Sequence, residues 1–476
     1  MRINIDNIGI VKDSYIELDG ITIITGHNNS GKTTVGKAVN ALYSAVENLE
    51  YCANRDKKSF VYSGVMGVVS GIFPPHINTS GYNLGNRISA KLSEWRNSAH
   101  IMVDINQTYF FDEITDILNM IQEGNDDQIC GMFKGINQSS MGDRILALKA
   151  NGEVIKGIEK IDKYKSLVND DADFMLYADK KIIRSLQKEF HDQITPIQYR
   201  DRIGSIRITE GGRTVFDVEI RKNETISNKH LYDLAANSEI ENVLMIDDAR
   251  VLDDLAENGM QIQSTKFWRS QIDAENYYEI IIAEDHRTRL SDKMMPTDSL
   301  YEEMNNEKSA DHILDLIDEA FSEEVVLSGS KLICSETKLD VRNLAAGSKM
   351  FAIIRQLLIK GQLTDKTLMI LDEPDDHLHP EWQLVLAKVL CLLNTEIGVK
   401  ILLTTHSTNL VYAFEIQAKK NNSDGLIRVY DTNKENDDYM VTYEEVTDNL
   451  DKVYQKLGEP FIQLRREEYA NDNTRS

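Results

Sequence analysis

The stretch Gly26-His-Asn-Asn-Ser-Gly-Lys-Thr33 decides the fold of this 476-residue chain. It has the pattern GxxxxGK[ST] of a phosphate-binding loop, in which backbone N–H groups turn inward around a phosphate chain. Residues 20–25 before it are apolar and β-branched, which predicts a buried strand. After it, apolar residues recur at helical spacing from Val35 to Leu49. Strand, glycine loop and helix, in that order, are the context that the motif needs.

Each position of this loop has an expected role toward a nucleotide. The glycines let the backbone curve, and the start of the following helix adds positive potential. Lys32 is expected to reach the β- and γ-phosphates, and the Thr33 hydroxyl to hold Mg²⁺. The other expected nucleotide contacts are Gly26, His27, Asn28, Asn29, Ser30, Gly31 and Thr34. The alternative interpretation is an ordinary glycine turn in front of a helix.

A second motif, Leu368-Met-Ile-Leu-Asp-Glu-Pro374, lies far along the chain. Its apolar residues predict a buried parallel strand, whose C-terminal end faces the crevice where ligands of open α/β sheets bind. Asp372 is expected to hold Mg²⁺, and Glu373 to orient or deprotonate the attacking water. Alternatively, the two acids only mark an exposed strand end. The presence of the phosphate loop favours the nucleotide site.

A third element is Lys400-Ile-Leu-Leu-Thr-Thr-His-Ser-Thr-Asn409, another apolar strand that ends in a histidine. A histidine in this place can contact a γ-phosphate and sense its loss. A single histidine at a strand end also occurs for structural reasons alone. The spacing of His406 from the two earlier motifs favours the γ-phosphate role.

Together, the three segments resemble the ABC-type ATPase heads of the SMC, RecF and OLD group. The resemblance is strongest to the compact ATPases of anti-phage defence systems, the PtuA-like and AriA-like proteins of the AAA_15 and AAA_21 type. The stretch His377-Leu-His-Pro-Glu-Trp-Gln383 is typical of this branch rather than of transporter ATPases. Residues 3–10 and 15–20 resemble the first two strands of such a head. The resemblance covers roughly residues 1–50 and 240–415.

The resemblance implies an α/β P-loop NTPase fold, with an ABC-type head, an antiparallel β-layer and a mainly helical insertion. It implies ATP and Mg²⁺ as cofactors, Lys32, Glu373 and His406 as catalytic residues, and Thr33 and Asp372 as metal ligands. Two or more copies are expected to associate around ATP. The implied role is to sense a phage trigger, such as DNA or a phage protein, and to gate a separate nuclease or toxin chain.

Such heads also carry a signature motif that one protomer presents to the nucleotide of the other. The candidate is Asn343-Leu-Ala-Ala-Gly-Ser-Lys349, from which Ala346, Gly347, Ser348 and Lys349 would contact the nucleotide. Relatives usually have a serine where this chain has Ala346, so slow hydrolysis is expected. A turn that caps a helix is the alternative. A glutamine that senses Mg²⁺ is also expected, and the candidates are Gln107, Gln193 and Gln198.

Composition agrees with a folded protein of the cytoplasm. The apolar fraction of 41% is enough for a substantial core. The four cysteines, Cys52, Cys130, Cys334 and Cys391, form no CxxC pair, which argues against a zinc hook or a disulfide framework. We find no signal-peptide pattern, and no apolar run approaches the roughly 18 residues that span a membrane.

The net charge of −24 argues against a general DNA-binding protein, because neutralising phosphates requires a basic surface. A local patch is still compatible with the mid-chain, which is richer in basic residues. These are Lys180, Lys181, Arg184, Lys188, Arg200, Arg202, Arg207, Arg221 and Lys222. Such a run is usually a solvated face. The acidic balance also suits a partner with a basic surface, or simple solubility.

Three regions are predicted along the chain: residues 1–95 with the phosphate loop, a mainly helical insertion over 96–195, and the rest of the head over 196–476. Glycines and prolines in residues 51–100 predict loops and short turns. Amphipathic stretches predict helices over most of 110–190.

Further along, alternation predicts a β-hairpin over 205–220 as part of the antiparallel layer. Glu241–Asp247 is expected to return to the main sheet, and 285–308 to be a mobile loop. No long heptad run predicts an SMC-type coiled coil.

The segment after His406 predicts two strands and a closing helix, with no room for the nuclease domain of OLD-type proteins. Asp437 and Asp438 could bind a metal but are more simply solvated loop acids. Three other functions stay open: a RecF-like or SMC-like DNA-repair ATPase, a transporter ATPase subunit, and a nucleotide-locked scaffold with little turnover.

Overall fold

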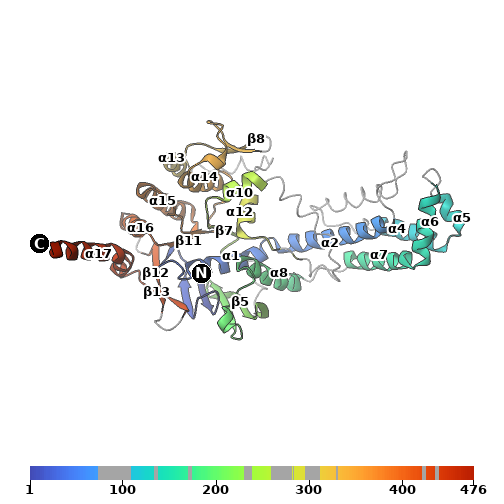
Figure 1. Ribbon diagram of the computed structural model, residues 1–476, viewed down its shortest axis with the longest axis horizontal. Coiled ribbons are helices and arrows are strands. Elements are labelled where there is room, and N and C mark those ends of the chain that lie inside the picture. Colours follow the sequence, from blue (N-terminus) through green and yellow to red (C-terminus); the bar gives the residue numbers. More distant parts are fainter. Residues whose placement is uncertain are drawn as a thin grey trace. The chain divides into compact units, whose positions relative to one another are not determined.

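The structure of the chain is a computed structural model that divides into two compact units (Figure 1). The first unit is Met1–Glu47, Ala178–Gln263 and Ile282–Ser476, and the second is Asn48–Tyr177 and Ser264–Ile281. The residues that the structure describes are 1–72, 109–132, 138–169, 174–229, 238–258, 281, 283–294, 311–328, 331–420, 425–434 and 439–475.

A six-stranded sheet forms the centre of the first unit, in the order β13-β12-β3-β11-β10-β7. Its strands are β3 Ile21–Thr25, β7 Asn242–Ile246, β10 Thr367–Asp372, β11 Lys400–Thr405, β12 Ile427–Lys434 and β13 Val441–Glu445. Neighbours run parallel, except that β13 is antiparallel to β12. Strands β3 and β11 are buried almost throughout, as expected of parallel strands that are covered on both faces.

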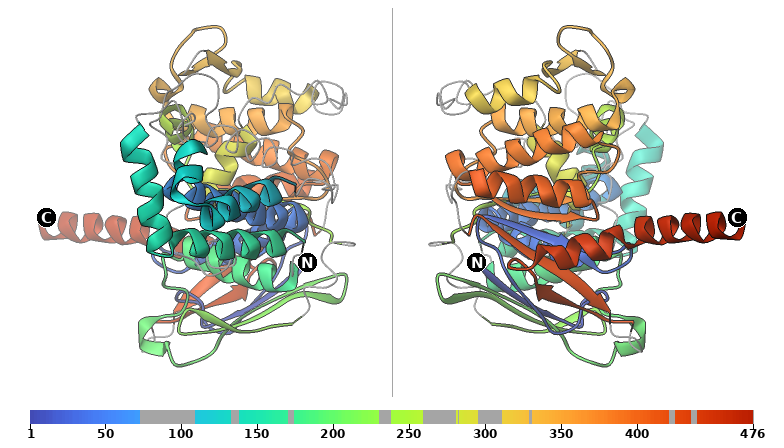
Figure 2. Two further views of the ribbon diagram at one scale, coloured as in Figure 1. Left: turned by 90° about the vertical axis from the view of Figure 1, so that its right-hand side faces the viewer. Right: turned by 90° about the vertical axis from the view of Figure 1, so that its left-hand side faces the viewer.

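Helices cover both faces of this sheet. Helix α1, Lys32–Val46, packs against β7, β10 and β11. On the other face lie α14 Ala346–Ile359, α15 Pro380–Leu392 and α16 Thr408–Lys420, whose apolar residues join one continuous core. Figure 2 shows these three helices and the second sheet of this unit on opposite sides of the six-stranded sheet.

The second sheet is antiparallel, in the order β2-β1-β4-β5-β6. Its strands are β1 Arg2–Asp6, β2 Ser14–Glu17, β4 Gly204–Glu210, β5 Arg213–Arg221 and β6 Glu224–Lys229. Exposed and buried residues alternate along β1 and β4, which is typical of a sheet with one covered face. The covered face meets α1, where the rings of Tyr43 and Phe216 pack edge to face at 5.1 Å. The predicted hairpin and antiparallel layer are confirmed.

The second unit is helical, with α2 Leu49–Ile72, α4 Tyr109–Glu123, α5 Asp126–Met132, α6 Gln138–Ala150 and α7 Glu153–Asn169. The prediction of loops in residues 51–100 is wrong for the part that belongs to α2. Residue Gly64 lies inside this helix, where a Cβ atom would come within 2.1 Å of the Tyr164 ring of α7. This glycine therefore allows two helices to approach closely, and residues 73–100 lie outside the described part of the chain.

The bounds of the helical unit differ from the sequence-based division at residues 95 and 195. Helix α2 follows α1 after only two residues, so the helical unit begins at Asn48. At its other end, α8 Phe174–Glu189 passes from the second unit into the first at residue 178. The predicted class, an α/β P-loop fold with an antiparallel layer and a helical insertion, is confirmed.

Shorter elements complete the first unit. They are η2 Ile197–Tyr199, α10 Val251–Asn258, α12 His286–Met294, α13 Asp311–Asp318, β8 Val325–Ser328, β9 Lys331–Cys334, η5 Val341–Asn343, η6 Leu393–Ile397 and α17 Leu450–Arg475. The predicted mobile loop over 285–308 is wrong at α12, because His286, Leu290 and Met294 are buried on one helical face. Residues 295–308 lie outside the described part.

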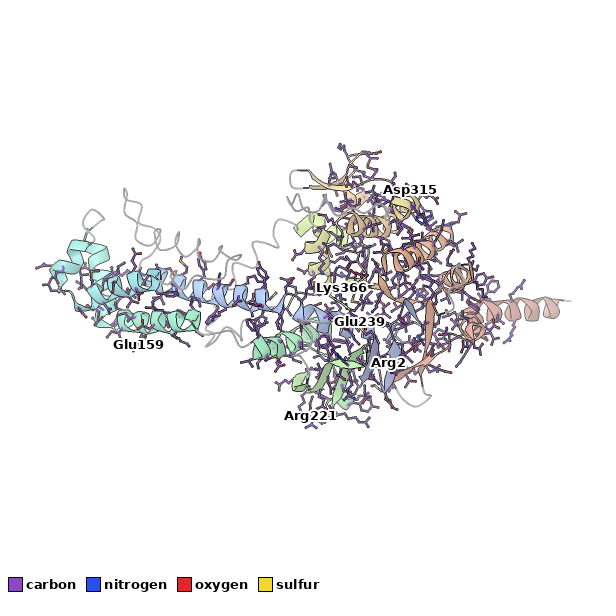
Figure 3. All side chains as sticks on the ribbon, turned by 180° about the vertical axis from the view of Figure 1, so that it is seen from behind. Arg2, Glu159, Arg221, Glu239, Asp315 and Lys366 are labelled. Atoms are coloured by element: carbon purple, nitrogen blue, oxygen red, sulfur yellow. The ribbon has the colours of Figure 1, made fainter. Side chains whose placement is uncertain are left out.

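Charged side chains such as Glu159 of α7 and Arg221 at the end of β5 are exposed (Figure 3). Within the described residues, none of the helices combines the length and the apolar character that crossing a bilayer requires.

Candidate nucleotide site

The phosphate loop joins β3 to α1 and owes its shape to left-handed backbone conformations. Positive φ angles occur at Gly26, Asn29 and Gly31. A Cβ atom at Gly26 would come within 1.8 Å of the Thr432 hydroxyl, so only glycine fits there. Gly31, with φ 74°, is the N-cap of α1. The side chains of His27, Asn28 and Asn29 are exposed, so the loop opens outward at its tip.

Lys32 lies inside this loop and is only 4% exposed. Its Nζ donates to the carbonyl oxygens of Gly26 at 3.3 Å and of His27 at 3.0 Å, and lies 3.0 Å from Glu373 Oε1. The ammonium group therefore links the loop to the acid that follows β10. Phosphate oxygens that enter the loop would compete for the same three donors.

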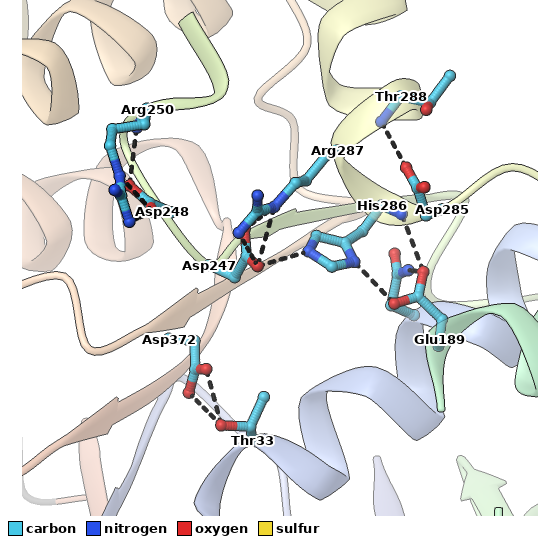
Figure 4. A network of polar contacts seen from close by, with 11 residues as sticks. Thr33, Glu189, Asp247, Asp248, Arg250, Asp285, His286, Arg287, Thr288 and Asp372 are labelled. Carbon is cyan, nitrogen blue, oxygen red and sulfur yellow. Dashed lines mark hydrogen bonds and ion pairs between the residues drawn. The ribbon is translucent and has the colours of Figure 1, made fainter. Parts of the chain in front are cut away.

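The two predicted metal ligands lie together at the carboxyl end of the sheet. The Thr33 hydroxyl donates to both carboxylate oxygens of Asp372, at 3.0 and 2.7 Å (Figure 4). Burial raises the pKa of Asp372, and the nearby charges of Glu373 and Asp247 add to this effect. A half-buried carboxylate beside other carboxylates and a hydroxyl is a suitable donor set for Mg²⁺, which binds oxygen ligands. These residues therefore fit the cation.

Glu373 adopts a backbone conformation that is uncommon for glutamate, with φ 49°. Its N–H donates to the carbonyl and hydroxyl oxygens of Thr404, at 3.1 and 3.0 Å, which holds the turn after β10 against β11. His406 follows β11 and is partly exposed, with Nδ1 3.7 Å from Glu373 Oε1. Ligand atoms of Glu373, Asp376 and His406 lie within 4.8 Å of one another. The predicted catalytic residues Lys32, Glu373 and His406 thus meet at one place.

The stretch from His377 to Gln383 connects the acidic turn with the histidine turn. The Gln383 amide nitrogen donates to the Leu378 carbonyl at 3.3 Å, while its oxygen accepts from the Ser407 hydroxyl at 2.8 Å. His379 caps α15, and Pro380 occupies the first turn of that helix, where a missing N–H is tolerated. The residues that mark the family resemblance therefore fix the relative position of the turns that carry Glu373 and His406.

The buried carboxylate of Asp375 also links the acidic turn to the end of β11. The Thr405 hydroxyl donates to Asp375 Oδ1 at 2.7 Å. Burial raises the pKa of Asp375, and this hydrogen bond opposes the rise.

The predicted signature motif lies at the start of α14. Gly347 is buried, and a Cβ atom there would come within 3.0 Å of Leu378 in the acidic turn. Ala346 and Ser348 are partly exposed. Lys349 is buried, and its Nζ binds the Asp253 carboxylate of α10 at 2.7 and 2.8 Å. The structure thus places the Lys349 side chain in an ion pair within the chain.

The sequence did not single out Asp247, His286 or Glu189. Asp247 follows β7, the neighbour of β10, and His286 begins α12. The imidazole lies between two carboxylates, with Nε2 3.1 Å from Asp247 Oδ2 and Nδ1 2.7 Å from Glu189 Oε2 (Figure 4). The only signal was the position of Asp247 at the end of a predicted strand.

Electrostatics in this group favour the charged forms. Burial disfavours the imidazolium, but the neighbouring carboxylates of Asp247 and Glu189 raise the pKa of His286 to about 9. Burial also disfavours the Asp247 carboxylate, yet the contacts with His286 and Arg287 hold its pKa well below the usual range.

Of the predicted glutamines, Gln193 and Gln198 are exposed, and Gln107 lies outside the described residues, as do Asp437 and Asp438.

Solved structures that are similar to the chain include three SMC heads. The SMC head domain from Thermotoga maritima is 9% identical, with 94% of this chain and 98% of that chain covered and a TM-score of 0.35. The Smc head domain with a coiled coil and joint from Pyrococcus yayanosii is 10% identical, with 96% and 99% covered and a TM-score of 0.34.

The third is the Smc head domain with an extended coiled coil from Pyrococcus furiosus, bound to the C-terminal domain of ScpA. It is 9% identical, with 96% and 98% covered and a TM-score of 0.25. Similarity at this level assigns no function. A search of curated proteins found none that matches. The family AAA_15, AAA ATPase domain, matches residues 1–411, so the chain belongs to this family and is a nucleotide-binding P-loop ATPase.

Proposed function

We propose that this ATPase hydrolyses ATP with Mg²⁺ at the loop Gly26–Thr34, and that two copies pair head to head around the nucleotide. The observation that carries the proposal is the convergence of Lys32, Thr33, Asp372, Glu373 and His406 at the carboxyl end of three adjacent strands. Ligands of open α/β sheets bind at this end.

The residues divide the chemistry among them. Thr33 and Asp372 would hold Mg²⁺, which supplies positive charge to the phosphates when it is bound. Lys32 brings a buried ammonium group to the same phosphates. Glu373, held by Thr404, is placed to accept a proton from the attacking water or to orient it. His406 lies on the exposed side of Glu373, where it can contact the γ-phosphate.

Pairing would complete the site with α14 of the second copy. The start of this helix presents Ala346, Gly347 and Ser348, and unpaired N–H groups at a helix start attract phosphate. In this proposal Lys349 contributes its backbone N–H and keeps its side chain on Asp253. Higher oligomers remain compatible with the same contact.

The biological proposal is a cytoplasmic ATPase in anti-phage defence that responds to a DNA or protein trigger and gates a separate nuclease or toxin. The resemblance of the stretch from His377 to Gln383 to that of compact defence ATPases supports this class. A net charge of −24 suits an effector with a basic surface.

The central test uses Glu373→Gln, which keeps the shape of the acid and removes its ability to accept a proton. We expect saturating ATP with Mg²⁺ to trap a dimer of this variant, measured by light scattering and native mass spectrometry. A variant that stays monomeric at saturating ATP would refute the pairing. Glu381→Gln, at an exposed acid in the first turn of α15, provides a matched control for the loss of one charge.

A mild affinity purification from the native host, followed by mass spectrometry, tests the gating. Recovery of a nuclease or toxin in stoichiometric amount is the expected result. Recovery of a bare dimer would refute a stably held effector and favour a scaffold.

A second candidate is direct action on DNA, as in RecF-like repair ATPases. It is favoured by exposed basic side chains around the antiparallel sheet, which are Arg200, Arg202, Arg213, Arg221 and Lys222. Acids already pair with Lys222, which lies 3.6 Å from Asp201, and with the neighbouring Arg207, which binds Asp217 at 3.2 Å. Strong, salt-dependent DNA binding by the purified chain would select this candidate.

A further inference from the structure

A third carboxylate stands at the carboxyl end of the sheet, beside the predicted metal ligand Asp372. Strands β7 and β10 are parallel, with Ile246 opposite Leu371. The next residues of the two strands are Asp247 and Asp372, and neighbouring strands are about 4.8 Å apart. Asp247 therefore follows the edge strand that neighbours the strand of Asp372, and its charge acts on the Asp372 carboxylate.

Among the described residues, the first turn of α12 holds Asp247 in place. His286 Nε2 lies 3.1 Å from its Oδ2, and the Arg287 guanidinium binds it at 2.8 to 3.1 Å. The carboxylate is partly exposed. A carboxylate has four lone pairs, more than the three nitrogen atoms of these two residues use, so the group retains acceptor capacity.

His286 connects Asp247 to two helices behind the site. Its backbone N–H and Nδ1 both bind Glu189 of α8, at 2.9 and 2.7 Å. Glu189 is 3% exposed, and its Oε1 also accepts from Asn40 of α1 at 3.0 Å. Helix α12 also contacts the end of α1, where Lys293 Nζ lies 3.0 Å from Oε1 of the C-cap residue Glu47.

Stability alone is a weak reason for this arrangement. Burying charged groups costs desolvation free energy, and apolar residues of similar size often serve a core as well. The contacts with His286 and Arg287 do, however, fix the orientation of the Asp247 carboxylate, which follows β7 outside any strand or helix. Both imidazole nitrogens are engaged, so the ring cannot rotate without losing a charged contact.

We propose that Asp247 is a charge partner for the divalent cation of the nucleotide site, beside Asp372, and that His286 is the positioning residue that ties Asp247 to Glu189 and Asn40. The inference rests on the proposed nucleotide site. It assigns the cation-facing role to an aspartate on the strand next to β10, where the sequence suggested a glutamine at residue 107, 193 or 198.

The experiment measures Mn²⁺ binding by electron paramagnetic resonance in the presence of ATP, and ATP binding by calorimetry with and without divalent cation, on the full chain. Loss of an outer partner of a metal site typically weakens metal binding 10- to 100-fold. We expect Asp247→Asn to weaken Mn²⁺ binding by about 10-fold or more, and His286→Gln by about 3- to 10-fold. Affinity for ATP without divalent cation should stay within about twofold of the wild type.

The matched control is Asp248→Asn. Asp248 is the next residue and also an acid, but its carboxylate binds Arg250 rather than His286 (Figure 4). Its loss should leave Mn²⁺ binding unchanged. Asp247→Glu keeps the charge and serves as the second variant if Asp247→Asn fails to fold. It should retain more Mn²⁺ affinity than His286→Gln.

Several outcomes would overturn the inference. Wild-type Mn²⁺ affinity in folded Asp247→Asn is one, and an equal loss of ATP affinity without divalent cation is another, because it would indicate a structural role only. If Asp247→Asn does not fold, wild-type Mn²⁺ affinity in His286→Gln has the same meaning. A wild-type chain that binds no ATP would instead refute the proposed nucleotide site, which Lys32→Ala tests separately.

Discussion

The centre and the edge of the six-stranded sheet present their functional residues in different ways. At the centre, the loop after β3 leads to Lys32 and Thr33, and β11 is followed by His406. The third strand, β10, leads to Asp372 and Glu373. Each of these strands carries its chemistry within a few residues of its own end. At the edge, Asp247 depends on His286 and Glu189, which come from two other segments. Local sequence motifs therefore predict the polar residues at the centre of the sheet, whereas the group around Asp247 at the edge is apparent only in the structure.

The largest expected effect is at the centre. Lys32→Ala removes a buried ammonium group that binds the loop carbonyls and Glu373. We expect ATP affinity to fall by about 100-fold or more, because hydrogen bonds to charged groups are among the strongest. Calorimetry with ATP and Mg²⁺ measures the change. Lys37→Ala, on the same helix but outside the loop, is the control. Unchanged ATP affinity in Lys32→Ala would show that the loop does not bind the nucleotide.

A second effect at the centre separates chemistry from binding. Glu373→Gln should lower ATP turnover by about 100-fold or more, since a positioned general base contributes rate accelerations of that size. Affinity for ATP should change little, because Lys32, Thr33 and Asp372 remain. Steady-state phosphate release measures turnover. Turnover near the wild-type rate would mean that another group accepts the proton, with His406 the nearest candidate.

The edge has its own prediction, which concerns stability and pH. The pKa of His286 is about 9 in the folded protein, above the 6.5 of an unperturbed histidine, because Glu189 of α8 and Asp247 after β7 face the ring. A raised folded-state pKa gives stability that is complete below pH 6.5 and is lost as pH rises through about 9. The contribution is about 3 kcal/mol at its largest.

Urea unfolding of the protein without nucleotide, at pH 6, 7.5 and 9.5, measures this contribution. The wild type should lose more unfolding free energy across that interval than His286→Gln, in which residue 286 no longer titrates. Parallel pH dependences of the two proteins would show that the imidazole gains no proton from folding. The comparison between variants cancels the other titrating groups.

What the sequence could predict follows the same division. The phosphate loop, the strand ending in Asp372 and Glu373, and the hairpin over 205–220 all depend on neighbours in sequence, and the structure has each element where it was expected. Helix α2 was missed because glycine usually interrupts helices, whereas Gly64 makes room for a ring from α7.

The roles of individual polar residues were harder to predict. Gln383 belonged to a recognised stretch, but its bond to Ser407 joins this stretch to the turn after β11, 24 residues further along the chain. The same holds for Asp247 and His286, which are separated by residues with no motif between them. Pairing of this kind is decided by packing, and a single sequence carries no direct record of it.

The smallest expected effect concerns the predicted signature motif, at the position where the family resemblance implies a serine. Ala346 lies there, at the start of α14, and Gly347 after it packs on Leu378 in the acidic turn. Ala346→Ser should raise turnover about fivefold, which corresponds to about 1 kcal/mol of transition-state stabilisation. ATP affinity of the monomer should not change, because the new hydroxyl would act on the nucleotide of the paired copy. Ser348→Ala, two residues on, controls for a hydroxyl at the wrong position.

If Ala346→Ser leaves turnover unchanged while Glu373→Gln still abolishes it, α14 does not face the γ-phosphate during hydrolysis. The chain would then work as a slow, nucleotide-locked scaffold.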